Sequence, residues 1–405
     1  MPHIPGTPSR RGLKRREEIL DAAQELFGAV GFEAATLRAL AKGIGMTHPG
    51  IRRHYASMED VLTAVLHRSG LDTPPPHLDP ADPSAALCEL ARSWQGDAET
   101  ARLYTTLLGE AAREGHPARP AIEARLLRFR EQLSLSGDPM RGAALTAAFD
   151  GLQLLRFYQP GRVVPAEVIT ARAAGRHHTP SPKGRGDWIT ATLDKPARSA
   201  PAPRPAPTDR IDSILDAAAR SFGRHGYRAS TLRAIAGSVD LAHATVLYYF
   251  DSKEALLEAV LNRRDRDADT AYIAPVTAFD RLGNVYRRAL YNQAHPEPIA
   301  LYSVLLCEAT STNHPAHDYF AARYTRVLDT VAAQVRDFQE QGLFRSDLDP
   351  EAEAAWFTAL WDGLQVHALY ADSGAIPEQL LRGLDELVAD SVPADRRVRA
   401  LTASP

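Results

Sequence analysis

The sequence has few cysteines, few aromatic residues, no excess of positive charge and no long apolar run. Two cysteines in 405 residues cannot form a disulfide framework, and this favours a reducing cytoplasm. No apolar run reaches about 18 residues and no apolar segment follows the N-terminal basic residues, so we expect neither a membrane span nor a secretion signal. With a net charge of −3, any nucleic-acid partner has to be recognised through local motifs.

Catalytic and metal-binding motifs are also lacking. The sequence has no G-x-S-x-G motif, no phosphate-cradling glycine loop and no pair of carboxylates that suggests acid–base chemistry. His314 and His317 lie close together, but no cysteine or acidic residue accompanies them at a metal-ligand spacing. We therefore expect no enzyme activity, no cofactor and no metal ion.

The chain does contain an internal duplication. Residues 19–68 and 214–263 are identical at 22 of 50 aligned positions, at an offset of 195. Downstream, Glu110 corresponds to Glu308 at an offset of 198, and Asp150 corresponds to Asp362 at an offset of 212. The first copy therefore lacks about fourteen residues between these blocks. A period this long indicates duplicated domains rather than a solenoid of small repeats.

Composition and the repeat divide the chain into six segments. Alternating Ala-Pro between the copies favours extended polyproline geometry, which is typical of a semi-rigid linker. The predicted segments are a basic N-terminal arm (1–17), a first head (18–68), a shortened first body (69–174), the linker (175–207), a second head (208–264) and a second body (265–405).

Apolar residues recur at helical spacing and no useful strand pattern is present, which predicts an all-α fold. In each copy the first amphipathic helix is followed by a glycine, Gly31 or Gly226, which we expect in the left-handed conformation. In the first copy, Thr36 caps a short helix over 37–43, and a second short helix follows over 47–55. Two short helices joined by a tight turn are typical of a helix-turn-helix.

Both stretches resemble the DNA-binding domain of the TetR/AcrR family of transcriptional regulators. The second copy carries the family pattern in Phe222-Gly223, Gly226-Tyr227, Thr231, Ile235-Ala236, Tyr248-Tyr249-Phe250 and Ser252-Lys253-Glu254-Ala255-Leu256. The first copy departs from it, with Arg52-Arg53-His54-Tyr55 as the ending and Met58 in place of lysine. The rest of each copy resembles the family's helical effector-binding and dimerisation domain. The resemblance implies a DNA operator and a small-molecule effector as partners.

DNA recognition requires phosphate contacts together with readout of base edges. In the first copy we expect these from Thr36, Arg38, Thr47, His48, Gly50, Arg52, Arg53 and His54. In the second copy we expect them from Thr231, Arg233, His243, Thr245, Leu247, Tyr248, Tyr249 and Lys253. Ile51, Tyr55, Val246 and Phe250 are expected in the core.

Each of these contacts has a structural alternative. A threonine N-cap stabilises its own helix whether or not it contacts DNA, and tyrosines often serve in packing. Lys253 is a phosphate contact that the family resemblance implies, and Met58 cannot make it. The basic residues from Arg10 to Arg16 either reach the minor groove or phosphates, or form a solvated tail.

Because one chain carries two heads, we expect the copies to pair as two subunits would, forming an intramolecular pseudo-dimer. The heads differ, so the operator need not be palindromic. The expected function is that of a cytoplasmic, ligand-released repressor. Two alternatives stay open: a homodimer with four heads, and a small-molecule-binding or scaffolding protein with one degenerate head.

Trp356, Trp361 and His367 are candidates for lining an effector pocket in the second copy, with bundle core as the alternative role. The shortfall of about fourteen residues predicts a reduced or lost pocket in the first copy, which leaves one effector site. Gly151 and Gly363 lie inside predicted helices, where glycine costs about 1 kcal/mol relative to alanine. We therefore expect close helix approach between the copies there.

Overall fold

The computed structural model describes residues 10–73, 82–134, 138–174, 210–270, 278–371 and 376–389. Within these ranges the regular elements are helices, apart from one isolated antiparallel bridge between Phe344 and Val388, which confirms the predicted all-α class. None of the described helices combines the length and apolarity needed to cross a membrane. The predicted linker and the first nine residues of the arm lie outside the described residues.

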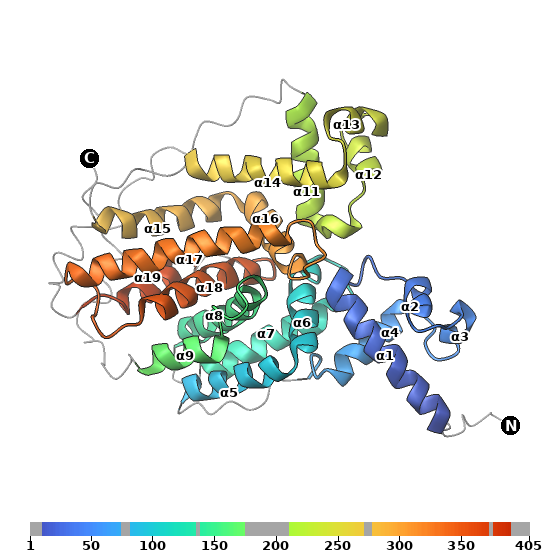
Figure 1. Cartoon of the computed structure of the whole chain (residues 1–405), viewed down its shortest axis with the longest axis horizontal. Coiled ribbons are helices and arrows are strands. Elements are labelled where there is room, and N and C mark those ends of the chain that lie inside the picture. Colours follow the sequence, from blue (N-terminus) through green and yellow to red (C-terminus); the bar gives the residue numbers. More distant parts are fainter. Residues whose placement is uncertain are drawn as a thin grey trace.

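Each helix of the first copy has a counterpart in the second, labelled ten numbers higher (Figure 1). The first copy comprises α1 (Arg10–Val30), α2 (Leu37–Gly43), α3 (His48–Arg52), α4 (Met58–Arg68), α5 (Pro83–Gly96), α6 (Ala98–Glu110), α7 (Arg119–Leu133), α8 (Pro139–Tyr158) and α9 (Pro165–Ala174). The second comprises α11 (Arg210–Ala229), α12 (Leu232–Gly237), α13 (His243–Tyr249), α14 (Lys253–Thr270), α15 (Ala278–Ala294), α16 (Pro296–Glu308), α17 (His317–Glu340), α18 (Pro350–His367) and α19 (Ile376–Asp385).

Local sequence signals account for the helix boundaries in both heads. Gly31 and Gly226 have φ of +78° and +76°, a conformation that favours glycine, and the chain turns there towards the next helix. The hydroxyls of Thr36 and Thr231 cap α2 and α12 by accepting the N–H of the third residue on. Residues 10–17 of the predicted arm are helical and continue into the head, because α1 already begins at Arg10.

Both heads lie at the same end of the molecule, on the right in Figure 1. Each packs on one helix of its own copy: α1 lies against α6, and α11 lies against α16. The remaining helices form the body, in which α8 and α18 lie against each other at the centre.

Glycine allows α8 and α18 to approach closely, as their sequence predicts. A Cβ atom added to Gly151 would lie 1.9 Å from the carbonyl oxygen of Ala359. Reciprocally, a Cβ on Gly363 would lie 1.8 Å from the carbonyl oxygen of Ala147. Both pairs are related by the repeat offset of 212, so the contact has approximate two-fold symmetry.

Tyrosine hydroxyls repeat this symmetry. Tyr158 donates to the carbonyl of Leu306, and its counterpart Tyr370 donates to the carbonyl of Leu108 over 2.6 Å. Nearer the heads, α6 and α16 meet at Gly109, where an added Cβ would lie 2.4 Å from the Cβ of its counterpart Cys307. The two copies are thus joined by equivalent residues on both sides of one pseudo-axis.

Candidate DNA-binding surface and effector cavity

The recognition helices α3 and α13 sit on a buried apolar side chain and present different outer faces. Ile51 and Val246, equivalent in the repeat, are fully buried, as predicted. Arg52 and Arg53 are exposed on the first head, while on the second Leu247 is 37% and Tyr248 82% exposed. The second face therefore offers an aromatic and an apolar side chain where the first face offers two basic ones.

The other predicted contact residues fall into two groups. Most are exposed, namely Thr36, Arg38, Thr47, His48, Thr231, Arg233 and His243, whereas Gly50, His54, Thr245 and Tyr249 are partly buried. Tyr55 is buried, but Phe250, predicted as core, is only partly buried. The hydroxyls of the threonine caps already accept backbone N–H groups, so the structural interpretation of those residues holds whether or not they also contact DNA.

Lys253 points inward in this structure. Its Nζ donates to the carbonyl of Arg228 at 3.4 Å and lies 4.2 Å from the centroid of the Tyr227 ring. Burial lowers its pKa. A phosphate contact by Lys253 therefore requires the side chain to leave Tyr227.

The two recognition helices begin differently. In α3 the Thr47 hydroxyl accepts the N–H of Gly50 at 3.2 Å. At the equivalent position in α13, Ala242 provides no side-chain cap. The first turn of α13 therefore lacks one stabilising interaction that α3 has.

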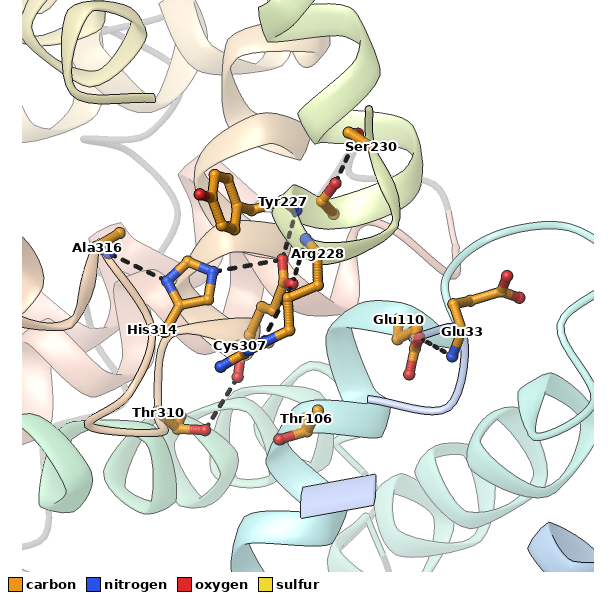
Figure 2. A network of polar contacts seen from close by, with 12 residues as sticks. Glu33, Thr106, Glu110, Tyr227, Arg228, Ser230, Cys307, Thr310, His314 and Ala316 are labelled. Carbon is orange, nitrogen blue, oxygen red and sulfur yellow. Dashed lines mark hydrogen bonds and ion pairs between the residues drawn. The ribbon is translucent and has the colours of Figure 1, made fainter. Parts of the chain in front are cut away.

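A partly buried carboxylate links each head to the body. Glu110, the last residue of α6, accepts the backbone N–H groups of Phe32 and Glu33, both at 2.7 Å. In the second copy Glu308 accepts the N–H groups of Tyr227 and Arg228, at 2.6 and 2.7 Å. Figure 2 shows Glu110 beside Glu33, and His314 beside Tyr227 and Arg228. Each carboxylate thus holds the turn that follows the first helix of its head.

A histidine lies next to each carboxylate: His116 next to Glu110, and His314 next to Glu308. His116 and His314 accept a backbone N–H on Nδ1, at 3.1 Å in both copies, so the neutral ring carries its hydrogen on Nε2. Those Nε2 atoms lie 3.8 Å from Glu110 and 3.7 Å from Glu308. Burial lowers the pKa of His116 to about 4 and raises that of Glu110 to about 7. His116 is therefore neutral at physiological pH.

The second copy encloses a cavity of about 1240 Å³, bounded by residues of α11, α14, α15, α16, α17 and α18. Its volume exceeds the few hundred to about 1,000 Å³ that is typical of small-molecule sites. Asp362 lies on its wall and accepts a hydrogen bond from Tyr324 at 2.6 Å. Burial raises the pKa of Asp362 to about 6.

Of the three predicted pocket residues, Trp361 lines this cavity. Trp356 and His367 do not line it, because α18 turns both towards the first copy, which agrees with their alternative role in the bundle core. The ring of Trp356 lies 4.8 Å below the guanidinium of Arg172, and His367 Nε2 lies 2.8 Å from the carboxylate of Asp150. Helical periodicity places these residues on different faces of one helix, which the sequence alone could not orient.

In the first copy, aromatic side chains occupy the corresponding space. The ring of Trp94 meets those of Tyr104 and Phe149 at centroid distances of 5.1 and 5.6 Å. Phe129 in turn meets Phe149 at 5.4 Å. The counterparts of Trp94, Tyr104, Phe129 and Phe149 are Asn292, Tyr302, Val327 and Trp361, and all four line the cavity of the second copy.

The absence of a cavity in the first copy is therefore not explained by the fourteen residues that this copy lacks. They shorten α7 to 15 residues against 24 in α17, together with the loop that follows. The first copy fills the space with larger side chains instead: it has Trp94 where the second copy has Asn292, and Phe129 where the second copy has Val327. The sequence prediction named a shortfall of chain, whereas the structure shows a difference in side-chain volume.

Comparisons with known proteins match both heads and the second body. The model described as "Bacterial regulatory proteins, tetR family" matches residues 19–65 and 214–260, and "BetI-type transcriptional repressor, C-terminal" matches residues 304–393. The chain is 29% identical over 186 residues to the HTH-type transcriptional repressor AcnR of Corynebacterium diphtheriae, a match that covers 45% of this chain and 91% of that protein. It is 37% identical over 81 residues to the repressor KstR of Mycobacterium tuberculosis, which covers 19% and 37% of the two chains.

Among solved structures, a transcriptional regulator from Saccharomonospora viridis in complex with choline is 26% identical, with a TM-score of 0.38. The match covers 44% of this chain and 97% of that one. These relatives are regulators of transcription and not enzymes, as predicted. Since the family's DNA-binding domain occurs at two places separated by the repeat offset, the chain belongs to the TetR family of bacterial transcriptional regulators and carries two family units in tandem.

Proposed function

We propose that this regulator is a repressor in which the two copies within one chain pair with each other as the two subunits of a homodimer would. The observation that carries the proposal is the reciprocal contact between α8 and α18, in which Gly151 meets Ala359 and Gly363 meets Ala147. Such a symmetric, closely packed contact is characteristic of an isologous interface between two subunits. With the copies paired in this way, both heads lie at one end of the molecule (Figure 1).

The two heads should read different half-sites. Arginine favours bidentate contact with guanine in the major groove, so Arg52 and Arg53 suit a G-containing half-site. Leu247 and Tyr248 instead offer apolar contact with thymine methyl groups and a hydroxyl for phosphate. The proposed operator is therefore asymmetric, with half-site centres about 34–36 Å apart, or one helical turn of DNA.

Release from DNA is proposed to start at the cavity of the second copy. Residues from Glu297 to Tyr302, in the first half of α16, line that cavity. The same helix ends at Glu308, which holds the turn at Tyr227 and Arg228 in the second head. A ligand that displaces α16 would move this turn and shift the population towards a different spacing of the heads.

Selection of bound sequences from random double-stranded DNA tests the readout. We expect an asymmetric site, with the Arg52→Ala/Arg53→Ala variant losing preference only in one half-site and Leu247→Ala/Tyr248→Ala only in the other. Each variant serves as the control for the other. An unchanged affinity of the Arg52→Ala/Arg53→Ala variant would instead favour a chain with one degenerate head.

Sedimentation of the chain on the selected operator tests the stoichiometry. One chain per operator at both nanomolar and micromolar concentration is the expected result, because tethering keeps the copies at a high effective concentration. Two chains per operator would establish the alternative with four heads.

A further inference from the structure

We infer that the cavity of the second copy binds an anionic amphiphile, a molecule with an acidic head group and an extended apolar body. The inference rests on the proposed function, since it names the chemistry of the effector. The two copies differ in two respects at this site. The second copy has a cavity where side chains fill the first copy, and the cavity is lined by arginines that the first copy lacks at the equivalent positions.

Six arginines line the cavity, and four of them lack a basic counterpart in the first copy. The counterparts of Arg220, Arg224, Arg264 and Arg288 are Glu25, Ala29, Ser69 and Leu90. Four of the six positive charges therefore occur only in the copy that has the cavity. Four acidic residues also line it: Asp216, Asp267, Glu297 and Asp362. Each has an acidic counterpart in the first copy, so the difference in charge between the copies comes from the four arginines. Arginine is the side chain best suited to hold carboxylate or phosphate, through paired N–H donors.

Part of this charge is available to a ligand. Arg263 already pairs with Asp216 at 2.7 Å, and Arg323 lies 3.6 Å from Asp265. Arg220 and Arg224 are exposed, and no acidic partner for either is found in the described part of the chain. They lie one turn apart on α11, so both guanidinium groups can reach one head group at the mouth of the cavity.

The interior is suited to an apolar body. Val327, Val331, Phe357 and Trp361 line it. Among the described residues, the buried Thr358 Oγ1 and Gln365 Oε1 have no hydrogen-bond partner, and both residues lie on the same wall. Buried polar atoms are normally satisfied, so these two suggest a polar group within the ligand's body or an ordered water.

The position of the head group would couple binding directly to DNA. Arg220 and Arg224 belong to α11, the first helix of the second head, whereas the apolar wall belongs to α17 and α18 of the body. An anionic amphiphile would therefore bridge head and body. The same molecule without its charge would contact mainly the body.

Calorimetric titration with four probes of one chain length tests the inference: tetradecanoate, tetradecyl phosphate, tetradecanol and tetradecyltrimethylammonium, each below its micelle concentration. We expect the two anions to bind at least about ten-fold more tightly than the alcohol, and the cation to bind most weakly. The ratio between carboxylate and phosphate identifies which head group the site prefers.

The variant Arg220→Glu/Arg224→Glu should weaken binding of the anions about ten-fold or more and leave the alcohol unchanged. Arg128→Glu/Arg141→Glu, at exposed positions of the first copy, is the matched control. Equal affinity for all four probes, tighter binding of the cation, or no binding by any probe would overturn the inference. None of these results would affect operator selection without ligand, so failure here is distinguishable from failure of the proposed function.

Discussion

The two copies share one helical plan, yet one is hollow where the other is solid. Arg125 and Arg323 are equivalent, and each guanidinium lies close to the equivalent tyrosine ring, 5.4 Å from Tyr104 and 5.5 Å from Tyr302. In the first copy Arg125 also lies 5.5 Å from the centroid of Trp94, so the indole stands where the second copy has open space. A few side-chain exchanges on the same order of helices thus separate a cavity from a packed core.

The largest effect is expected from exchanging Trp94, which fills the space in the first copy, for its counterpart in the second copy, Asn292. Trp94→Asn should destabilise the protein by about 4 kcal/mol, because it removes a buried indole and leaves a cavity. The opened space should admit one molecule of the uncharged tetradecanol per chain in addition to any bound in the second copy, measured by calorimetry, because the first copy has Glu25 and Ala29 in place of Arg220 and Arg224. The reverse exchange, Asn292→Trp, should reduce binding in the second copy. Unchanged stoichiometry in both variants would contradict the comparison of cavities.

The contact between α8 and α18 should respond equally from either side. Gly151→Ala and Gly363→Ala each place a methyl group against a backbone carbonyl and should cost about 3 kcal/mol, measured by denaturant unfolding. Gly96→Ala is the control, since a Cβ there meets nothing within 4 Å. A large difference between the two glycines would show that the copies do not share this interface symmetrically.

Asp362 should make stability fall as the pH rises. Its pKa of about 6 exceeds the ordinary value of 3.8, so between these values the folded protein binds more protons than the unfolded chain. The free energy of unfolding therefore declines through that window and stays lower above pH 6. Asp362→Asn, which keeps an oxygen for Tyr324, should flatten this decline and add about 2 kcal/mol at pH 7.

Thermal unfolding from pH 4 to pH 7 measures the Asp362 effect, with the exposed Asp251→Asn as control. A decline of wild-type size in Asp362→Asn would show that another group causes it.

The smallest effect concerns the start of each recognition helix. Thr47→Ala should cost about 1 kcal/mol, and Ala242→Thr should gain a similar or smaller amount, because one removes and the other supplies an N-cap. Hydrogen exchange of the amides in α3 and α13 measures both. Faster exchange in α3 is expected for Thr47→Ala, and slower exchange in α13 for Ala242→Thr. Unchanged exchange in α3 of the first variant or in α13 of the second would show that capping does not set the stability of these helices.

Patterns local in sequence predicted the heads well. Thr36, Thr231 and the glycines at 31 and 226 act through residues a few positions away, so their spacing is sufficient to locate helix boundaries. The prediction that glycine in α8 and α18 means close approach also held, since few other reasons favour glycine inside a helix.

Side-chain direction was harder to predict. Trp356, Trp361 and His367 lie on one helix between two neighbours, and only the crossing of α8 and α18 decides which of them faces the cavity. The ties at Glu110 and Glu308 were also missed. Their carboxylates accept N–H groups about 80 positions away in sequence, although the repetition of a glutamate at both positions was a usable signal.

The meeting of Gly109 with Cys307 determines which halves can associate. Two second copies joined in this arrangement would bring two cysteine Cβ atoms about 2.4 Å apart, well inside the roughly 3.8 Å found even across a disulfide. Two first copies would leave a gap between glycines. The junction thus favours pairing of a first copy with a second copy over pairing of two identical copies. The residue allowed at position 109 therefore depends on the residue at position 307.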